Sequence, residues 1–98
     1  MAHVDDAARC IHLECYGGNA STVELPIRSI MTDAARFGSA GVILAHNHPS
    51  GDPTPSQADY RATRALVRAA ETIDLAIVDH LVFAQGAECK SMRRMGFL

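Results

Sequence analysis

The stretch of this 98-residue chain with the clearest chemical potential runs from His46 to Asp59. His46 and His48 end a run of apolar residues and lie two positions apart, so an extended backbone would direct both imidazoles to the same side. Asp59 follows eleven residues later, at the start of a helical pattern and after a loop with three prolines. Two histidines and one carboxylate are the number and kind of ligands that a catalytic zinc ion uses, with a fourth position left for water. The spacing therefore predicts a zinc site.

Each part of this stretch also has a purely structural explanation. Two histidines at a strand end can simply be hydrogen-bonded surface residues. Ser56 and Asp59 have the spacing of a capping box, in which the serine caps a helix and the acidic residue returns a hydrogen bond to it. As a cap alone, Asp59 would point at the Ser56 backbone N–H and not at a metal. These explanations do not account for the occurrence of all the features within fourteen residues.

The elements around this stretch are expected to alternate between strands and helices. Apolar residues at helical spacing predict one helix that opens at Pro26 and ends at Gly38, and a second from Ser56 to Ile73. The continuous apolar run at 41–45 (GVILA) is typical of a strand covered on both faces. The expected class is α/β or α+β, with helices packed on a central sheet. Strands are predicted at 9–16, 21–25, 41–45 and 75–84, with a turn at 17–19 and a short strand plus a helical turn within 88–98.

The composition fits one small globular domain and disfavours several classes of function. Hydrophobic residues make up 48% of the chain, yet no apolar run is long enough for a transmembrane helix, and no signal peptide is evident. The net charge of −2 argues against nucleic-acid binding by phosphate neutralisation. Cys10, Cys15 and Cys89 are an odd number of cysteines and are expected to be buried thiols in a reducing cytosol. We therefore expect a cytoplasmic protein.

The same stretch resembles the signature of a known family. His46-Asn47-His48, seven residues, Ser56, two residues and Asp59 match the H-x-H-x7-S-x2-D core of the JAB/MPN metalloprotease (JAMM) signature. The sequence of residues 46–59, HNHPSGDPTPSQAD, is similar to that of the RadC branch of the family, the proteins called DNA repair protein RadC. Segments at 26–45, 63–66, 78–82 and 96–98 extend the resemblance over nearly the whole chain.

The resemblance implies a single RadC-like MPN/JAMM domain over residues 1–98. Its fold would be layered and similar to cytidine deaminases, with a mixed central sheet flanked by helices. His46, His48 and Asp59 would bind Zn²⁺, and Ser56 would help to stabilise an oxyanion. A zinc-bound water would attack a peptide-like carbonyl, so a peptide or protein is the expected substrate. Self-association into a homo-oligomer is left open.

The chain departs from the family pattern on its N-terminal side. The family has a general acid/base Glu just before its first core strand, and counting back from His46 by the usual distance overruns Met1. The chain is therefore expected to begin within that strand, at His3–Val4, without the family's helix-hairpin-helix region. Glu14 and Glu24 fit solvated strand positions better than a replacement base. The alternative function is a catalytically impaired MPN module that works through protein contacts.

Two further features have a structural and a functional interpretation. Asp79 and His80 interrupt an apolar strand and could orient a ligand imidazole, but a buried structural pair is the favoured interpretation. Three arginines of the second helix predict a solvated face in preference to a phosphate contact: Arg61, Arg64 and Arg68.

Overall fold

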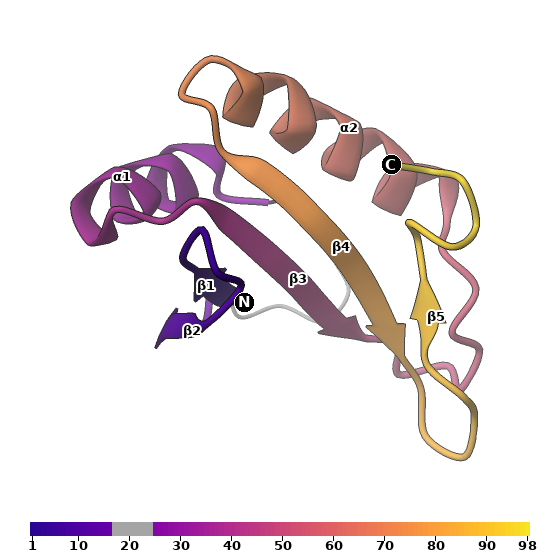
Figure 1. The fold of residues 1–98 in the computed structure, drawn as a ribbon. Helices are drawn as coiled ribbons and strands as arrows, with labels where there is room; N and C mark the ends of the chain where they lie inside the picture. The colour runs from indigo at the N-terminus through magenta and orange to yellow at the C-terminus, as the bar shows by residue number, and fades with distance from the viewer. Residues whose placement is uncertain (17–24) are drawn as a thin grey trace.

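The computed structural model of the chain describes residues 1–16 and 25–98 (Figure 1). In this part of the chain, five strands form one mixed sheet in the order β2-β1-β3-β4-β5. Neighbouring strands are antiparallel except β3 and β4, which are parallel and are connected through helix α2. The expected α+β class, with a mixed central sheet flanked by helices, is confirmed. The elements are β1 (Ala2–Val4), β2 (Cys10–Leu13), α1 (Ile27–Phe37), β3 (Gly41–Asn47), α2 (Gln57–Glu71), β4 (Ala76–Phe83) and β5 (Lys90–Ser91).

Both helices pack against β3 and β4 through a single core. Because alternate residues of β3 point to one side, the presence of Val42 and Leu44 in this core places α1 and α2 on the same face of the strand. The expectation that β3 is covered on both faces is wrong, since Ala45 is exposed and Ile43 is only half-buried. The core cluster consists of Ile30, Ala34, Val42, Leu44, Leu66, Ala70, Leu75 and Ile77.

The ends of the first helix follow the sequence signals. α1 begins directly after Pro26 and ends at Gly38, whose φ of 66° is left-handed and favours glycine. The strand expected at 9–16 is shorter, Cys10–Leu13. The expected turn at 17–19 and the strand at 21–25 lie outside the described residues, apart from Leu25, which is not in a strand. After β5, a single helical turn is closed by the Met95 N–H, which donates to the Ser91 carbonyl at 3.1 Å.

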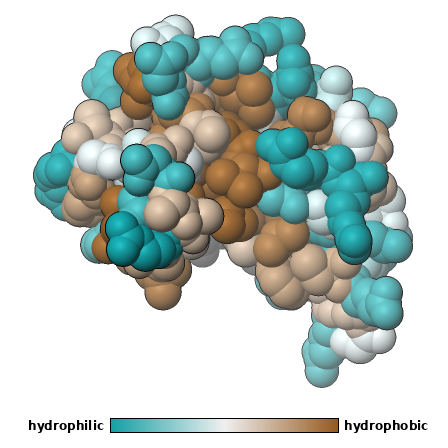
Figure 2. All heavy atoms as spheres, viewed as in Figure 1, coloured by the Kyte–Doolittle hydropathy of each residue, from teal (hydrophilic) through white to brown (hydrophobic). Residues whose placement is uncertain are grey.

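The three cysteines lie at the surface. Cys10, Cys15 and Cys89 are exposed free thiols, so the expectation of buried thiols is wrong. Cys10 belongs to β2, which is an edge strand with only one neighbour and is therefore poorly covered. Apolar side chains are exposed as well, among them Leu13 at 72% and Phe83 at 44%. Figure 2 shows apolar atoms gathered near the centre of one face. None of the described helices has the length and apolar character needed to cross a bilayer.

Candidate metal centre

The C-terminal end of β3 carries both histidines of the predicted site. His46 belongs to the strand, and His48 directly follows its last residue. The His48 backbone N–H donates to the Phe83 carbonyl at 2.7 Å, which keeps this segment beside β4. The two imidazole centroids are 4.7 Å apart, so the prediction that both rings project to one side is confirmed. The His46 and His48 side chains are 29% and 19% exposed, so both rings remain partly accessible to solvent.

The loop at 49–55 brings the start of α2 back to this strand end. Gly51 adopts a φ of 87°, a left-handed conformation that glycine permits, and its N–H donates to the His48 carbonyl at 3.2 Å. His48 Nδ1 lies 2.9 Å from the backbone carbonyl oxygen of Asp52, so the loop also holds the ring. The chain then enters α2, with Asp59 in its first turn. The tight loop therefore determines where the carboxylate lies relative to the histidines.

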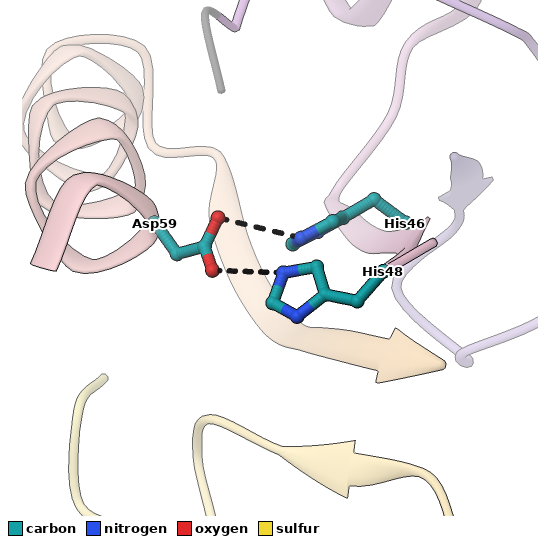
Figure 3. Close-up of side chains that lie close together, drawn as sticks. All are labelled: His46, His48 and Asp59. Carbon is teal, nitrogen blue, oxygen red and sulfur yellow. Dashed lines mark hydrogen bonds and ion pairs between the residues drawn. The ribbon is translucent and has the colours of Figure 1, made fainter. Parts of the chain in front are cut away.

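Asp59 faces both histidine rings (Figure 3). Its Oδ1 lies 3.3 Å from His46 Nε2, and its Oδ2 lies 3.1 Å from His48 Nε2. One potential ligand atom from each of the three residues lies within 4.8 Å of the others, and the Asp59 side chain is fully buried. The structure thus brings together the three residues that the sequence spacing had grouped.

Ser56 and Asp59 also form the complete capping box. Ser56 Oγ accepts a hydrogen bond from the Asp59 backbone N–H at 3.0 Å, and the Ser56 backbone N–H donates to Asp59 Oδ2 at 2.7 Å. Asp59 points at the Ser56 backbone N–H, as a cap would, and it also faces the two histidines, so it is not a cap alone. A carboxylate offers about four lone-pair directions, so one group can serve the cap and still face the histidines.

Hydrogen bonds determine which site atoms carry free lone pairs. Since a carbonyl oxygen can only accept, His48 Nδ1 donates to Asp52, while His48 Nε2 is paired with Asp59 Oδ2 at 3.1 Å. When the ring carries only its Nδ1 proton, Nε2 has a lone pair that a metal can use. His46 Nε2 and Asp59 Oδ1 are buried and have no hydrogen-bond partner. Buried acceptors that face one another are costly unless a cation lies between them. Two imidazole nitrogens and a carboxylate suit zinc in donor type and number, so the residues present fit this ion.

The electrostatic environment favours the protonation states that bind a metal. Burial lowers the pKa of His46, although the nearby Asp59 carboxylate opposes the shift. Burial alone would raise the pKa of Asp59, but the hydrogen bond from the Ser56 backbone and the charges of the two histidines lower it below its usual value. The His46 imidazole is therefore neutral and the Asp59 carboxylate ionised near neutral pH, as metal ligation requires.

A buried polar chain lies behind His46. His80 Nε2 is 2.7 Å from His46 Nδ1, and Thr63 Oγ1 is 2.7 Å from His80 Nδ1. Burial, and then the neighbouring His46, lower the pKa of His80 to about 4. The favoured interpretation of His80 as purely structural missed its contact with a site histidine. Thr63 was not singled out in the sequence, where its only signal is its position one helical turn after Asp59.

Asp79 and Glu14 have local partners away from the three-residue cluster. Asp79 accepts hydrogen bonds from the Ser91 hydroxyl and from the Arg93 backbone N–H, so its role is structural, as favoured from the sequence. Glu14 lies 2.6 Å from His12 Nε2. Glu24 lies outside the described residues. Within the described ranges, Asp59 is the one carboxylate in contact with His46 or His48.

A helix-flanked mixed sheet, with a His-x-His strand end facing an aspartate in the following helix, defines a JAB-type domain. A family model described as "RadC-like JAB domain" matches residues 1–97, so the chain belongs to this family. The chain is also 42% identical over 87 residues to the UPF0758 protein YfjY of Escherichia coli (strain K12). That match covers 89% of the chain and 54% of the relative, so the chain spans about half the length of this curated relative.

Proposed function

We propose that this domain is a zinc-dependent hydrolase of peptide or isopeptide bonds, with zinc held by His46, His48 and Asp59. The supporting observation is the convergence of their ligand atoms within 4.8 Å, with His46 Nε2 and Asp59 Oδ1 buried and unpartnered. In a site of this kind, zinc lowers the pKa of water to about 7 and polarises the scissile carbonyl.

The residues around the cluster would position the ligands and the substrate. Ser56 holds the Asp59 carboxylate through its backbone N–H, and its Oγ is used only as an acceptor from the Asp59 N–H. The Ser56 hydroxyl proton is therefore free, and the residue is exposed at the edge of the cluster. It could donate a hydrogen bond to the oxyanion that develops when a carbonyl is attacked.

Substrate class and location are further parts of the proposal. A peptide or protein substrate follows from the family resemblance, and the net charge of −2 disfavours nucleic acid as an alternative. Three exposed free thiols fit a reducing compartment, so we propose that the protein acts in the cytoplasm.

A second candidate function is a non-catalytic MPN module that works through protein contacts. It is favoured by one observation, that Asp59 is the sole carboxylate of the described residues in contact with the site histidines. As a ligand, Asp59 could not also act as the general base. General acid/base assistance typically contributes about 10²–10⁴-fold to a rate, so a metal-loaded module without it would hydrolyse slowly.

Metal analysis of the purified chain tests the zinc site. We expect near-stoichiometric zinc in the wild type and sharply reduced zinc in His46→Ala and His48→Ala, because each variant lacks one of three ligands. His12→Ala is the matched control, since His12 is hydrogen-bonded to Glu14 and is not part of the cluster. Equal zinc content in all four proteins would refute the site. Peptidase assays of zinc-loaded protein then separate the hydrolase from the module.

A further inference from the structure

Three hydrogen bonds through Thr63 and His80 connect two of the proposed zinc ligands, Asp59 and His46, and the two bonds made by Thr63 are buried. Thr63 Oγ1 donates to the backbone carbonyl of Asp59 at 2.8 Å. The same oxygen lies 2.7 Å from His80 Nδ1, and His80 Nε2 lies 2.7 Å from His46 Nδ1. Thr63 and His80 are 0% and 1% exposed, so water does not reach the hydrogen bond between them.

We infer that Thr63 and His80 are positioning residues that hold His46 in the tautomer able to bind a metal through Nε2. This inference rests on the proposed zinc site. The Thr63 hydroxyl has one proton, and the Asp59 carbonyl, which can only accept, receives it. Toward His80, Thr63 Oγ1 must then accept, so His80 carries its proton on Nδ1.

The same reasoning fixes the tautomer of His46. A neutral imidazole has one N–H, so His80 Nε2 is an acceptor, and the proton of the 2.7 Å contact comes from His46 Nδ1. His46 Nε2 is left with its lone pair directed at the cluster. Histidine ligands in metal sites commonly donate their other N–H in this way, which fixes ring orientation and raises ligand basicity.

The opposite direction of donation is disfavoured by the geometry. It would place a proton on His46 Nε2, which lies 3.3 Å from Asp59 Oδ1 but outside hydrogen-bond geometry with it. Both of these atoms are buried and make no hydrogen bond. The reversed chain would also withdraw the Thr63 proton from the Asp59 carbonyl. When His46 donates to His80 and His80 donates to Thr63, each N–H and O–H proton of the three residues has an acceptor. The lone pair on His46 Nε2 then remains free and faces Asp59.

Replacement of Thr63 tests this series of hydrogen bonds at a residue that does not contact the side chain of any proposed zinc ligand. Thr63→Val keeps the shape but removes the acceptor for His80 Nδ1–H, whereas Thr63→Ser keeps the hydroxyl. ¹⁵N NMR of histidine-labelled, metal-free protein at about pH 8, where unperturbed imidazoles are neutral, reports each tautomer. We expect Nδ1–H on His46 and His80 in the wild type and in Thr63→Ser, and a shift of both to Nε2–H in Thr63→Val.

Zinc affinity, measured by competition with a chelator, is the second readout. We expect about 10–100-fold weaker zinc binding in Thr63→Val and near wild-type binding in Thr63→Ser. A wild-type His46 that carries its proton on Nε2 would overturn the inference, and this measurement requires no variant to fold. Unchanged tautomers and unchanged affinity in Thr63→Val would overturn it as well. A wild type that binds no zinc would refute the proposed function. The tautomers of His46 and His80 in the metal-free protein would still show whether the hydrogen bonds from His46 through His80 to Thr63 run in the inferred direction.

Discussion

The Ser56 backbone N–H donates to Oδ2 of Asp59 at 2.7 Å, while the Asp59 backbone N–H donates to Ser56 Oγ at 3.0 Å. This reciprocal pair begins α2 and at the same time orients the carboxylate that faces the site histidines. The first turn of the helix is thus a structural part of the candidate metal centre. Asp59 is held in place by the fold itself, so little ordering would be needed when an ion binds.

The two roles proposed for Ser56 can be separated by substitution. Ser56→Ala removes the acceptor for the Asp59 N–H and should lower the free energy of unfolding by about 1 kcal/mol in urea titrations. Ser56→Asp should restore this stability, because aspartate is an equally good N-cap. An ionised carboxylate cannot donate to an oxyanion, so hydrolysis by zinc-saturated Ser56→Asp should stay low. Wild-type hydrolysis in that variant would show that Ser56 acts only as a cap.

Substitution of Asp59 separates the cap from the metal ligand. Asp59→Asn keeps an oxygen that can accept from the Ser56 N–H but loses the negative charge, so zinc content should fall sharply with little loss of stability. Asp59→Ala loses both functions and should also be destabilised by about 1 kcal/mol. Zinc analysis of the two purified variants, and urea unfolding of the same variants after metal removal, check this. Wild-type zinc content in Asp59→Asn would contradict a ligand role for the carboxylate.

The stability of the metal-free protein should fall as the pH decreases from 6.5 toward 4. The pKa of His80 is about 4 in the folded protein, against 6.5 for an unperturbed histidine. Between these values the unfolded chain binds a proton that the folded chain does not, so the stabilisation is present above pH 6.5 and is lost on acidification. The loss from His80 alone is about 3 kcal/mol, and His46 and His3, whose pKa values are also lowered, act in the same direction.

Urea unfolding at several pH values in this window measures the effect. His80→Phe is the control, because it removes the buried imidazole, and its stability should depend less steeply on pH. Carboxylates such as Asp59, whose pKa is lowered, contribute only at more acidic pH. Equal slopes for the wild type and His80→Phe between pH 6.5 and about 4 would show that His80 is not the group responsible.

The local features of the site could be predicted from the sequence because they depend on short-range geometry. The i, i+2 spacing of His46 and His48, and the helix start at Ser56, do not require knowledge of the rest of the fold. The loop between His48 and Ser56 is short, so it restricts where Asp59 can lie relative to the histidines.

Features that depend on the arrangement of the whole sheet could not be predicted in this way. Cys10 is exposed because β2 is an edge strand, and Ala45 is exposed because both helices lie on one face. The contact between His80 and His46 depends on the register of β3 and β4, in which Leu44 pairs with His80 and His46 with Val82. The hydrophobic pattern of the sequence predicts neither the order of the strands in the sheet nor their register.

The source of a general base decides between enzyme and module. Since Asp59 is the sole described carboxylate at the site histidines, we expect this 98-residue chain to bind zinc but to hydrolyse peptide or isopeptide bonds weakly. A missing base costs about 10²–10⁴-fold in rate. An N-terminal extension that carries a Glu before β1 should recover a rate increase of this order in a peptidase assay.

The same extension with Gln in place of that Glu is the matched control, because it has the same shape but cannot take a proton. Both extended proteins should bind zinc equally, and only the one with Glu should gain activity. If a second copy of the chain supplies the carboxylate instead, the specific activity of the unextended protein should rise with its concentration. Fast hydrolysis by the unextended monomer that is abolished by Glu14→Gln or Glu24→Gln would show that the base lies within these 98 residues. In that case the solvated positions assigned to these two glutamates would be wrong, and the module interpretation would be excluded.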